Sequence, residues 1–324
     1  MSIVVQKFGG TSVATPQARE ALINQVRNCK EEGNDIIVVV SAMGRYGDPY
    51  ATDTLIHLLE QINPNLMLRK KDLMMSCGET ISCSLISHLL ESNNIPAEPL
   101  TGFQAGIHTT NIFGNSEIVN IDTSNIEKLL KEGKVVVVAG FQGITNEGEI
   151  TTLGRGGSDI SAIAIGGYLK AQRVDIFTDV LGIAKIDPRI VADADFMDSV
   201  TYDDMFTLAE EGAKVIHPRA VAMAKKFNIP VRVRSTFFQD MGTLIIGEGV
   251  QYNHKIIGIA IKKEIERSTP MNVSCPMGKI FILFDETQKE EMKNEIKSYV
   301  AQSKLINYEI LWGNNNLSIL LPSD

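Results

Sequence analysis

Short runs of β-branched residues recur between residues 36 and 177, separated by stretches with helical periodicity. The strand-like runs are 36–40, 135–139 and 174–177. The helical stretches are 18–29, 125–132 and 158–169. Continuous apolar β-branched runs are typical of strands that are buried on both faces of a parallel sheet. The alternation therefore predicts an α/β fold, with helices on both faces of a mostly parallel sheet.

Polar, glycine-rich segments follow three of the expected strands. They cover residues 7–12, 41–53 and 140–159. Ligands of open α/β folds bind beyond the carboxyl ends of the strands, where such segments begin. The three segments are therefore candidates for a ligand site.

The first of these segments reads Lys-Phe-Gly-Gly-Thr-Ser and directly follows a short apolar strand. Thr15 suits the N-cap of the next helix, and Pro16 suits its first position. Glycines such as Gly9 and Gly10 let backbone N–H groups converge on an anion, and Lys7 adds a point charge. The segment is interpreted as a phosphate cradle, with a simple tight turn as the alternative. It differs from the common P-loop, whose Gly-x-x-x-x-Gly-Lys-Ser/Thr pattern the chain lacks.

Residues 154–159 read Gly-Arg-Gly-Gly-Ser-Asp at an expected junction between a loop and a helix. Arg155 can hold a carboxylate through two parallel hydrogen bonds, and the glycines let a ligand approach the backbone. Helix capping and the helix dipole are the alternative explanations for Ser158 and Asp159. Capping does not explain an arginine between glycines.

Two further segments carry isolated charges. Residues 76–79 read Ser-Cys-Gly-Glu and place Glu79 at an expected break between two helices, with a solvated carboxylate as the alternative. Residues 211–218 lie between two expected short helices, and Pro218 is predicted to begin the second. Lys214 falls in the turn between them, again with a solvated side chain as the alternative. His217, directly before the proline, is interpreted as a structural histidine rather than a base.

The strand at 174–177 ends in a loop that contains Thr178, Asp179 and, farther on, Asp187-Pro188-Arg189. Such a loop suits the sugar and base of a nucleotide, although Asp-Pro and glycine are also ordinary turn signals. Taken together, the candidate segments offer cations, backbone donors and hydroxyls, with no metal cage and no Ser/His/Asp or Cys/His arrangement. Phosphoryl transfer requires that set, because its catalysis is mostly positioning and charge neutralisation.

Charge and composition limit the partners and the compartment. The chain has 324 residues and a formal net charge of −8, which argues against nucleic acid or an anionic membrane as the main partner. No signal peptide is visible, and no apolar run approaches the length of a membrane span. The four cysteines are interpreted as reduced, buried thiols in a cytoplasmic protein. They are Cys29, Cys77, Cys83 and Cys275.

A change in character after residues 247–249 divides the chain into two expected domains, 1–246 and 250–324. The second is predicted to be a small α+β module. Its expected strands are 256–261, 280–284, 306–312 and 317–321, with a helix at 286–301 and a turn at 313–316. Met292, Ile296 and Val300 mark the inner face of that helix.

In order and in spacing, the segments together resemble the aspartokinases of the amino acid kinase family. The matching pieces are VQKFGGTSV, VVVSAMG followed by Thr52-Asp53, SCGE, TLGRGGSD, TDVLGI, DPRIV, GAKVIHP and IPVRVRS. The likeness runs almost continuously from residue 1 to about residue 246.

The resemblance implies a three-layer α/β/α sandwich and an ATP-dependent kinase that phosphorylates the β-carboxylate of L-aspartate. The product, 4-phospho-L-aspartate, is the entry to lysine, threonine, methionine and diaminopimelate biosynthesis. The resemblance also implies that Mg²⁺ is held mainly by phosphates and water, with no metal site on the protein. No general base is needed, because a carboxylate nucleophile is already ionised at neutral pH.

The resemblance assigns roles to matching positions. The expected catalytic residues are Lys7, Asp159 and Lys214. The expected aspartate-binding residues are Ser41, Thr52, Glu79, Arg155 and Ser158. The expected ATP-binding residues are Lys7, Gly9, Gly10, Thr11, Thr178, Asp179, Lys185, Arg189 and Lys214.

The chain departs from the family in two places. Residues 182–187 read Gly-Ile-Ala-Lys-Ile-Asp, so base stacking or nucleotide preference near Lys185 is expected to differ. Family members end in two ACT modules, whereas residues 250–324 leave room for barely one, without the usual Pro-x-x-Pro-Gly turn. We expect this truncated ACT-like module to serve association into a homodimer or higher homo-oligomer, or to carry a reduced regulatory site.

Two alternatives to an active aspartokinase remain open from sequence alone. A sibling kinase would keep the fold but use acetylglutamate, glutamate, carbamate or a nucleotide as acceptor; Arg155 together with Glu79 favours an α-amino acid. A non-catalytic relative would bind effectors or partners through its ACT-like tail. The presence of Lys7, Asp159 and Lys214 together favours the catalytic interpretation.

Overall fold

The computed structural model describes residues 2–250, 252, 256–262, 278–284, 289–294 and 309–321. Its largest element is an eight-stranded sheet in the order β10-β12-β11-β9-β1-β2-β6-β3. All neighbouring pairs in this sheet are parallel except β11 and β12, so the expected mostly parallel sheet is confirmed. The strands are β1 Ile3–Phe8, β2 Asp35–Val40, β3 Ala97–Leu100, β6 Val135–Ala139, β9 Arg173–Thr178, β10 Ser199–Thr201, β11 Val231–Ser235 and β12 Thr243–Ile246.

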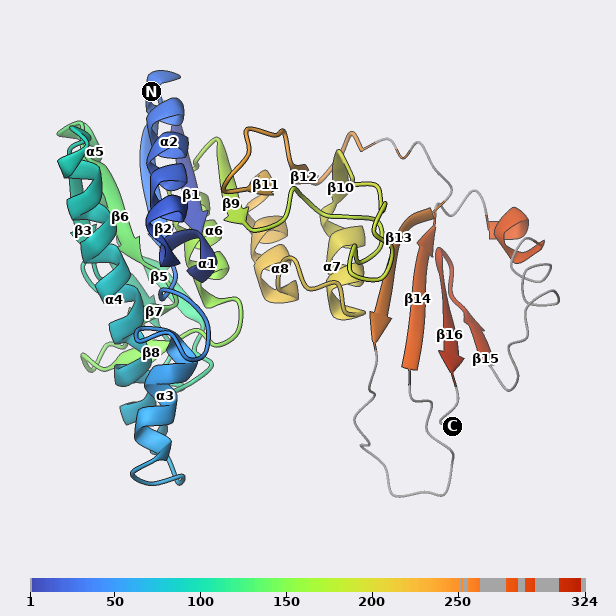
Figure 1. Cartoon of the computed structure of the whole chain (residues 1–324), viewed down its shortest axis with the longest axis horizontal. Coiled ribbons are helices and arrows are strands. Elements are labelled where there is room, and N and C mark those ends of the chain that lie inside the picture. The colour runs from blue at the N-terminus through green and yellow to red at the C-terminus, as the bar shows by residue number, and fades with distance from the viewer. Residues whose placement is uncertain are drawn as a thin grey trace.

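Helices cover both faces of this sheet, as Figure 1 shows. They are α1 Gly10–Ala14, α2 Pro16–Glu31, α3 Thr52–Glu60, α4 Leu68–Ser92, α5 Ser124–Lys131, α6 Gly157–Tyr168, α7 Tyr202–Glu210 and α8 Pro218–Phe227. Alternate residues of β1 point into two separate apolar cores. Val4 and Phe8 pack with α2 and α4, whereas Val5 packs with α6 and α8. The expected three-layer α/β/α sandwich is confirmed.

Local sequence signals begin and end several helices where expected. The Thr15 hydroxyl accepts a hydrogen bond from the Ala18 amide at 3.1 Å, and Pro16 begins α2. Gly33, just beyond the end of α2, has a φ of +83°, a conformation that favours glycine. Pro218 begins α8, as predicted.

The expected helix break at residues 76–79 is wrong. Helix α4 runs unbroken for 25 residues through this segment. A Cβ atom on Gly78 would lie 2.7 Å from the Ala42 Cβ and 3.1 Å from the Tyr50 carbonyl oxygen. Gly78 therefore lets the helix approach the loop after β2, and this approach brings the next residue, Glu79, to that loop.

Among the described residues, one helix, α4, is long and apolar enough to cross a membrane. Half of its apolar window is buried inside the protein, where α4 packs against β3, β6 and β8. Asp72 and Glu79 lie on this buried side. These features are those of a core helix, and its apolar length is greater than the sequence interpretation allowed.

The described cysteines are free, but they are not all buried as expected. Cys29 and Cys83 are buried, and burial raises the pKa of their thiols to about 11 and about 12. Cys77 is exposed, because it lies on the outer side of α4. Cys275 lies outside the described residues.

A second, four-stranded sheet was not expected from the sequence. Its order is β5-β4-β7-β8. The strands are β4 Ile107–Thr109, β5 Ile118–Ile121, β7 Gln142–Ile144 and β8 Ile150–Thr152. Strand β8 packs on α4 and leads directly into the loop that contains Arg155.

The C-terminal module is a four-stranded antiparallel sheet in the order β13-β14-β16-β15. Its strands are β13 Ile256–Lys262, β14 Gly278–Phe284, β15 Glu309–Trp312 and β16 Asn316–Leu321. The expected strands are confirmed where the structure describes them; residues 306–308 of the third expected strand lie outside the described residues. The turn at 313–316 is confirmed, with Gly313 N–H donating to the Asn316 carbonyl at 2.8 Å. Residues 289–294 are helical with Met292 buried, whereas Ile296 and Val300 lie outside the described residues.

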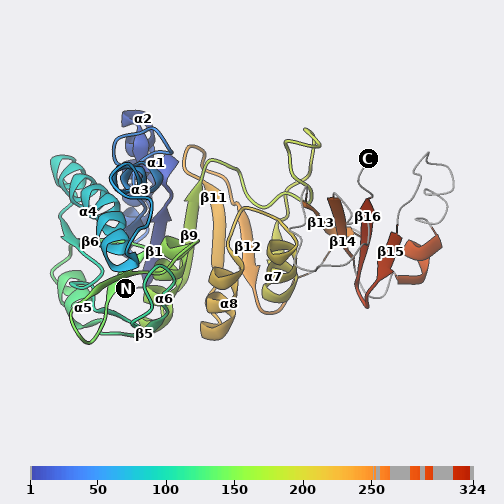
Figure 2. The same cartoon turned by 90° about the horizontal axis from the view of Figure 1, so that it is seen from below.

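This module packs against the end of the large sandwich, beside α7 (Figures 1 and 2). Ile257 and Phe281 share an apolar core with Leu208 of α7. Lys279 pairs with Glu211 at 2.7 Å across the same boundary. The division into domains 1–246 and 250–324 and the association through this module stay predictions.

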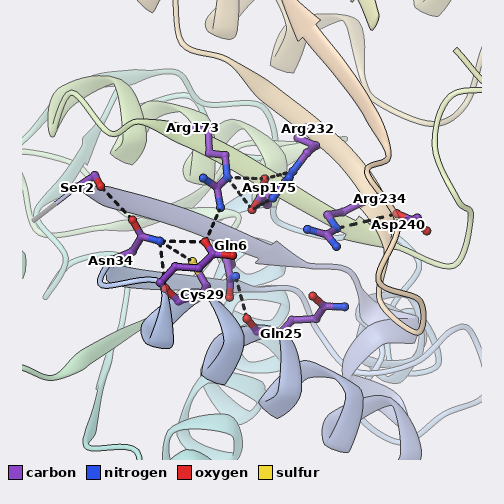
Figure 3. A network of polar contacts seen from close by, with 11 residues as sticks. Ser2, Gln6, Gln25, Cys29, Asn34, Arg173, Asp175, Arg232, Arg234 and Asp240 are labelled. Atoms are coloured by element: carbon purple, nitrogen blue, oxygen red, sulfur yellow. Dashed lines mark hydrogen bonds and ion pairs between the residues drawn. The ribbon is translucent and has the colours of Figure 1, made fainter. Parts of the chain in front are cut away.

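One face of the large sheet carries a cluster of charged side chains on β9 and β11, next to α2. Arg173 and Arg232 converge on the carboxylate of Asp175 in Figure 3. Arg232 donates to both Asp175 oxygens at 2.8 Å, and Arg173 Nε lies 3.2 and 3.3 Å from them. Asp175 is only 1% exposed. A buried carboxylate is stable in such a place only while cations and hydrogen bonds compensate its lost hydration.

We expect Asp175→Ala to lower the free energy of unfolding by about 3 kcal/mol, because it leaves two partly buried guanidinium groups without their shared carboxylate. Denaturant unfolding measures this change. The matched control is Asp203→Ala, which removes an exposed pair with Lys225 and should cost less than about 1 kcal/mol. Equal losses for the two variants would contradict the importance given to the buried network.

Candidate active site

A cavity of about 780 Å³ lies beyond the carboxyl ends of β1, β2 and β6. All three polar segments singled out in the sequence contribute to its walls. The predicted site residues that line it are Lys7, Gly10, Ser41, Thr52, Glu79, Arg155, Ser158 and Asp159. Every residue predicted to bind the acceptor therefore lies around one cavity.

Lys7 and Asp159 form an ion pair in this cavity. The Lys7 Nζ lies 2.7 Å from an Asp159 carboxylate oxygen, and each side chain is 12% exposed. Lys7 is near the carboxyl end of the central strand β1, and Asp159 is in the first turn of α6. The pair fixes the ammonium group on the cavity wall, in surroundings from which most water is excluded.

Glu79 is a buried carboxylate with spare hydrogen-bonding capacity. Its side chain lies in the cavity wall and the residue is only 3% exposed. Oε1 accepts a hydrogen bond from the Ala42 amide at 3.1 Å, whereas the buried Oε2 has no partner. Desolvation raises the pKa of Glu79 to about 7, partly offset by the Ala42 hydrogen bond. A cationic group in the cavity would satisfy Oε2 and favour the ionised form.

The loop with Arg155 has a backbone that its glycines make possible. Gly154 and Gly156 have φ angles of +74° and +72°. A Cβ atom on Gly156 would lie 2.5 Å from the Cβ of His217, so this loop and the turn before α8 are in close contact. Arg155 itself is exposed and projects from this narrow loop at the cavity.

Sequence reasoning missed Phe141 as a wall residue of the same cavity. Phe141 follows β6 and has a φ of +71°, which is uncommon for a residue with a side chain. The Ser161 hydroxyl accepts its amide hydrogen bond at 3.0 Å and helps to hold this backbone. The sequence feature that could have indicated its place in the cavity is its position directly after an expected strand, next to Gly140.

A second cavity of about 470 Å³ lies next to the first. Gly44 lines the first cavity, and its neighbour Arg45 lines the second. The predicted nucleotide-side residues in its walls are Thr178, Asp179, Arg189 and Lys214. Arg45 pairs with Asp179 at 3.0 Å, a contact that the sequence did not indicate. Strand β13 also contributes residues to the lining of this cavity.

One predicted nucleotide residue, Lys185, lies outside the described lining of this cavity, and Arg189, which lines it, is already paired with a neighbouring carboxylate. The Lys185 Nζ lies 3.6 Å from Asp195, and the Lys185 carbonyl accepts from the Ile259 amide. Arg189 is bound to Asp187 and lowers the pKa of that carboxyl to about 2. The nucleotide roles of both stay predictions.

The expected phosphate cradle begins helix α1. A Cβ atom on Gly10 would lie 2.7 Å from the Ala42 carbonyl oxygen, so glycine is needed for the approach to the loop after β2. The Gly9 amide donates to the Phe177 carbonyl at 3.3 Å. Gly9 and Thr11 are outside the described lining of both cavities, and their contacts with phosphate stay predictions.

His217 has a structural position, as interpreted from the sequence. Its ring Nδ1 accepts a hydrogen bond from the Arg219 amide at 3.3 Å and caps helix α8. Burial lowers its pKa, so the neutral ring that accepts this bond is favoured.

Known proteins are similar to this chain in both sequence and fold. The model of the amino acid kinase family matches residues 2–235. An aspartokinase of Geobacillus stearothermophilus is 43% identical over 285 residues, which are 88% of this chain and 69% of that protein. Aspartate kinase from Synechocystis has a TM-score of 0.67 at 37% identity. E. coli aspartokinase III in complex with aspartate and ADP has a TM-score of 0.67 at 25% identity.

The matches differ in how much of each relative the chain spans. The chain covers about half, 52%, of the Synechocystis protein while 98% of its own length is matched. For the E. coli enzyme the corresponding shares are 79% and 99%. The family model alone accounts for more than half of the chain. The chain therefore belongs to the amino acid kinase family and, within it, to the aspartokinases.

Proposed function

We propose that this chain transfers the γ-phosphate of ATP to the β-carboxylate of L-aspartate and forms 4-phospho-L-aspartate. The observation that most supports it is Glu79, a buried carboxylate with an unpartnered oxygen in the cavity that Arg155 also lines. An α-amino acid brings an ammonium group and a carboxylate that match these two side chains. The reaction begins lysine, threonine, methionine and diaminopimelate biosynthesis. Because it uses ATP and free aspartate, we assign the protein to the cytoplasm.

Aspartate occupies the first cavity in this proposal. Arg155 binds its α-carboxylate through two parallel hydrogen bonds, and Glu79 binds its α-ammonium group. Hydroxyl groups of Ser41, Thr52 and Ser158 lie around the same cavity and orient the reacting β-carboxylate. An acylated amine would leave Glu79 unsatisfied, which disfavours acetylglutamate as acceptor.

Lys7 and Lys214 act on the phosphates, one from each cavity. Their charges neutralise the phosphoryl group as it moves to the aspartate carboxylate, and Asp159 holds Lys7 in place. The backbone of 9–11 contacts phosphate, while Thr178, Asp179, Lys185 and Arg189 lie on the nucleotide side. The acceptor carboxylate is already ionised, so no side chain removes a proton.

Magnesium fits this site as an ion carried by the nucleotide. The described residues bring no three histidine, cysteine, aspartate or glutamate side chains together. The donor set of lysines and hydroxyls suits phosphate oxygens rather than a cation. Bound Mg²⁺ supplies charge neutralisation on the phosphates, in addition to that from Lys7 and Lys214.

The test of this function is turnover of MgATP with L-aspartate in the presence of hydroxylamine, which traps an acyl phosphate as a hydroxamate. We expect hydroxamate with aspartate, and little with glutamate or acetylglutamate at equal concentration. Trapped product with another acceptor would identify a sibling kinase. No product while ATP binds would identify a non-catalytic relative.

Arg155→Ala should raise the KM for aspartate by about a hundredfold or more, because it removes a bidentate, charge-assisted contact. The KM for MgATP should change little. Steady-state kinetics with each substrate varied in turn measures both constants. An unchanged aspartate KM would move the acceptor site away from Arg155.

The pKa of Glu79, raised to about 7, gives aspartate use a pH dependence. Only the ionised carboxylate attracts the substrate ammonium, so kcat/KM for aspartate should rise as the pH increases through 7 and then level off. We expect Glu79→Gln to lower kcat/KM and to remove this rise. A flat wild-type profile between pH 6 and 8 would contradict the assignment.

A further inference from the structure

The segment from Thr152 to Gly156, which carries Arg155, is held by two side chains that have no role of their own in the proposed reaction. They are Asp72 of α4 and Arg219 of α8. Neither is among the described residues that line the two cavities. Their contacts connect the elements that carry Glu79, Arg155 and Lys214.

Asp72 holds the start of the segment. The residue is fully buried, and its carboxylate accepts from the Thr152 amide at 2.9 Å and from the Thr152 hydroxyl at 2.9 Å. It also accepts from the Gly114 amide at 2.8 Å. Asp72 lies two helical turns before Glu79 on the same buried side of α4. Helix α4 thus carries both Glu79 and the anchor of the loop that carries Arg155.

Arg219 of α8 holds the same segment through the Leu153 carbonyl. Its Nη1 donates to the Leu153 carbonyl and to the Asn115 side-chain oxygen, both at 2.6 Å. Its Nη2 donates to the Ser116 carbonyl at 3.2 Å. Arg219 lies in the first turn of α8, directly after the turn that contains Lys214.

We propose that Asp72 and Arg219 are positioning residues for aspartate: together they clamp the 152–156 segment and so set where Arg155 meets the substrate. This inference rests on the proposed function. Asp72 fixes the segment to the helix of Glu79, and Arg219 fixes it to the helix that follows Lys214. Because reactivity depends steeply on placement, a displacement of Arg155 by about 1 Å is enough to reduce turnover by up to a hundredfold.

The test uses Arg219→Gln and Asp72→Asn in the full chain. Each variant should lower kcat/KM for aspartate by about tenfold or more, with the KM for MgATP within about twofold of the wild type. Arg219→Lys, which keeps the charge and one donor group, should recover part of the loss. The matched control is Arg232→Gln, which disturbs a partly buried arginine of the Asp175 network and should leave both constants unchanged.

A double-mutant cycle separates positioning from general destabilisation. If the clamp acts through Arg155, adding Arg219→Gln or Asp72→Asn to Arg155→Ala should cause no further loss in kcat/KM for aspartate. An equal loss in both backgrounds would overturn the proposal. So would an unchanged aspartate kcat/KM in both single variants.

Hydrogen exchange keeps this test distinct from that of the proposed function. Both variants should speed amide exchange in residues 152–156 relative to the wild type, and Arg232→Gln should not. If the wild type phosphorylates no aspartate, the proposed function fails. Hydrogen exchange alone then tests whether Asp72 and Arg219 hold the 152–156 segment. Faster exchange confined to this segment would then support the clamp, and unchanged exchange would overturn it.

Discussion

The ion pair between Lys7 and Asp159 joins the central strand β1 to helix α6, and the candidate site depends on both elements. Lys7 extends from β1, which has helices packed on both sides, and Asp159 lies in the first turn of α6 on one of those faces. Both side chains are largely shielded from water, so each would lose more hydration than it could recover without the other. The pair therefore holds an ammonium group at the carboxyl end of the sheet, in the wall of the first cavity.

The rest of the fold brings further groups to this pair through close backbone approaches. Gly78 and Gly10 let α4 and α1 contact the loop after β2 from two directions. Glu79 thereby reaches the Ala42 amide, and the cradle segment lies beside the same loop. Gly154 and Gly156 shape the loop of Arg155 next to His217. The placement of Glu79 and Arg155, which bind the two ends of aspartate in the proposed function, thus depends on positions where a Cβ atom does not fit.

The central strands and the polar segments that line the first cavity could be predicted from the sequence, because their signals are local. A buried parallel strand is a continuous β-branched run, and residues 36–40 and 135–139 are such runs. Glu79 was singled out from the sequence, but the local structure predicted around it was wrong. Residues 76–79 were interpreted as a helix break, whereas Gly78 lies inside α4 and allows its close contact with the loop after β2. The three-residue strands β4, β7 and β8 were missed, because so few residues show no clear alternation.

Long-range contacts explain what local sequence reasoning did not find. Asp72 is a single acidic residue in a helix, and nothing near it in sequence indicates that Thr152 is its partner. Arg219 follows a recognised motif, yet its acceptors lie more than 60 residues away. Cys77 was expected to be buried with the other thiols, but the continuous α4 turns it outward.

The most direct measurement is a crystal structure of the protein with L-aspartate and MgADP. We expect the α-carboxylate of aspartate at Arg155, its ammonium group at Glu79, and its β-carboxylate directed toward Lys7. We expect ADP in the neighbouring cavity, near Asp179 and Lys214. Aspartate bound elsewhere, or bound in this cavity with its ammonium group away from Glu79, would contradict the site as described.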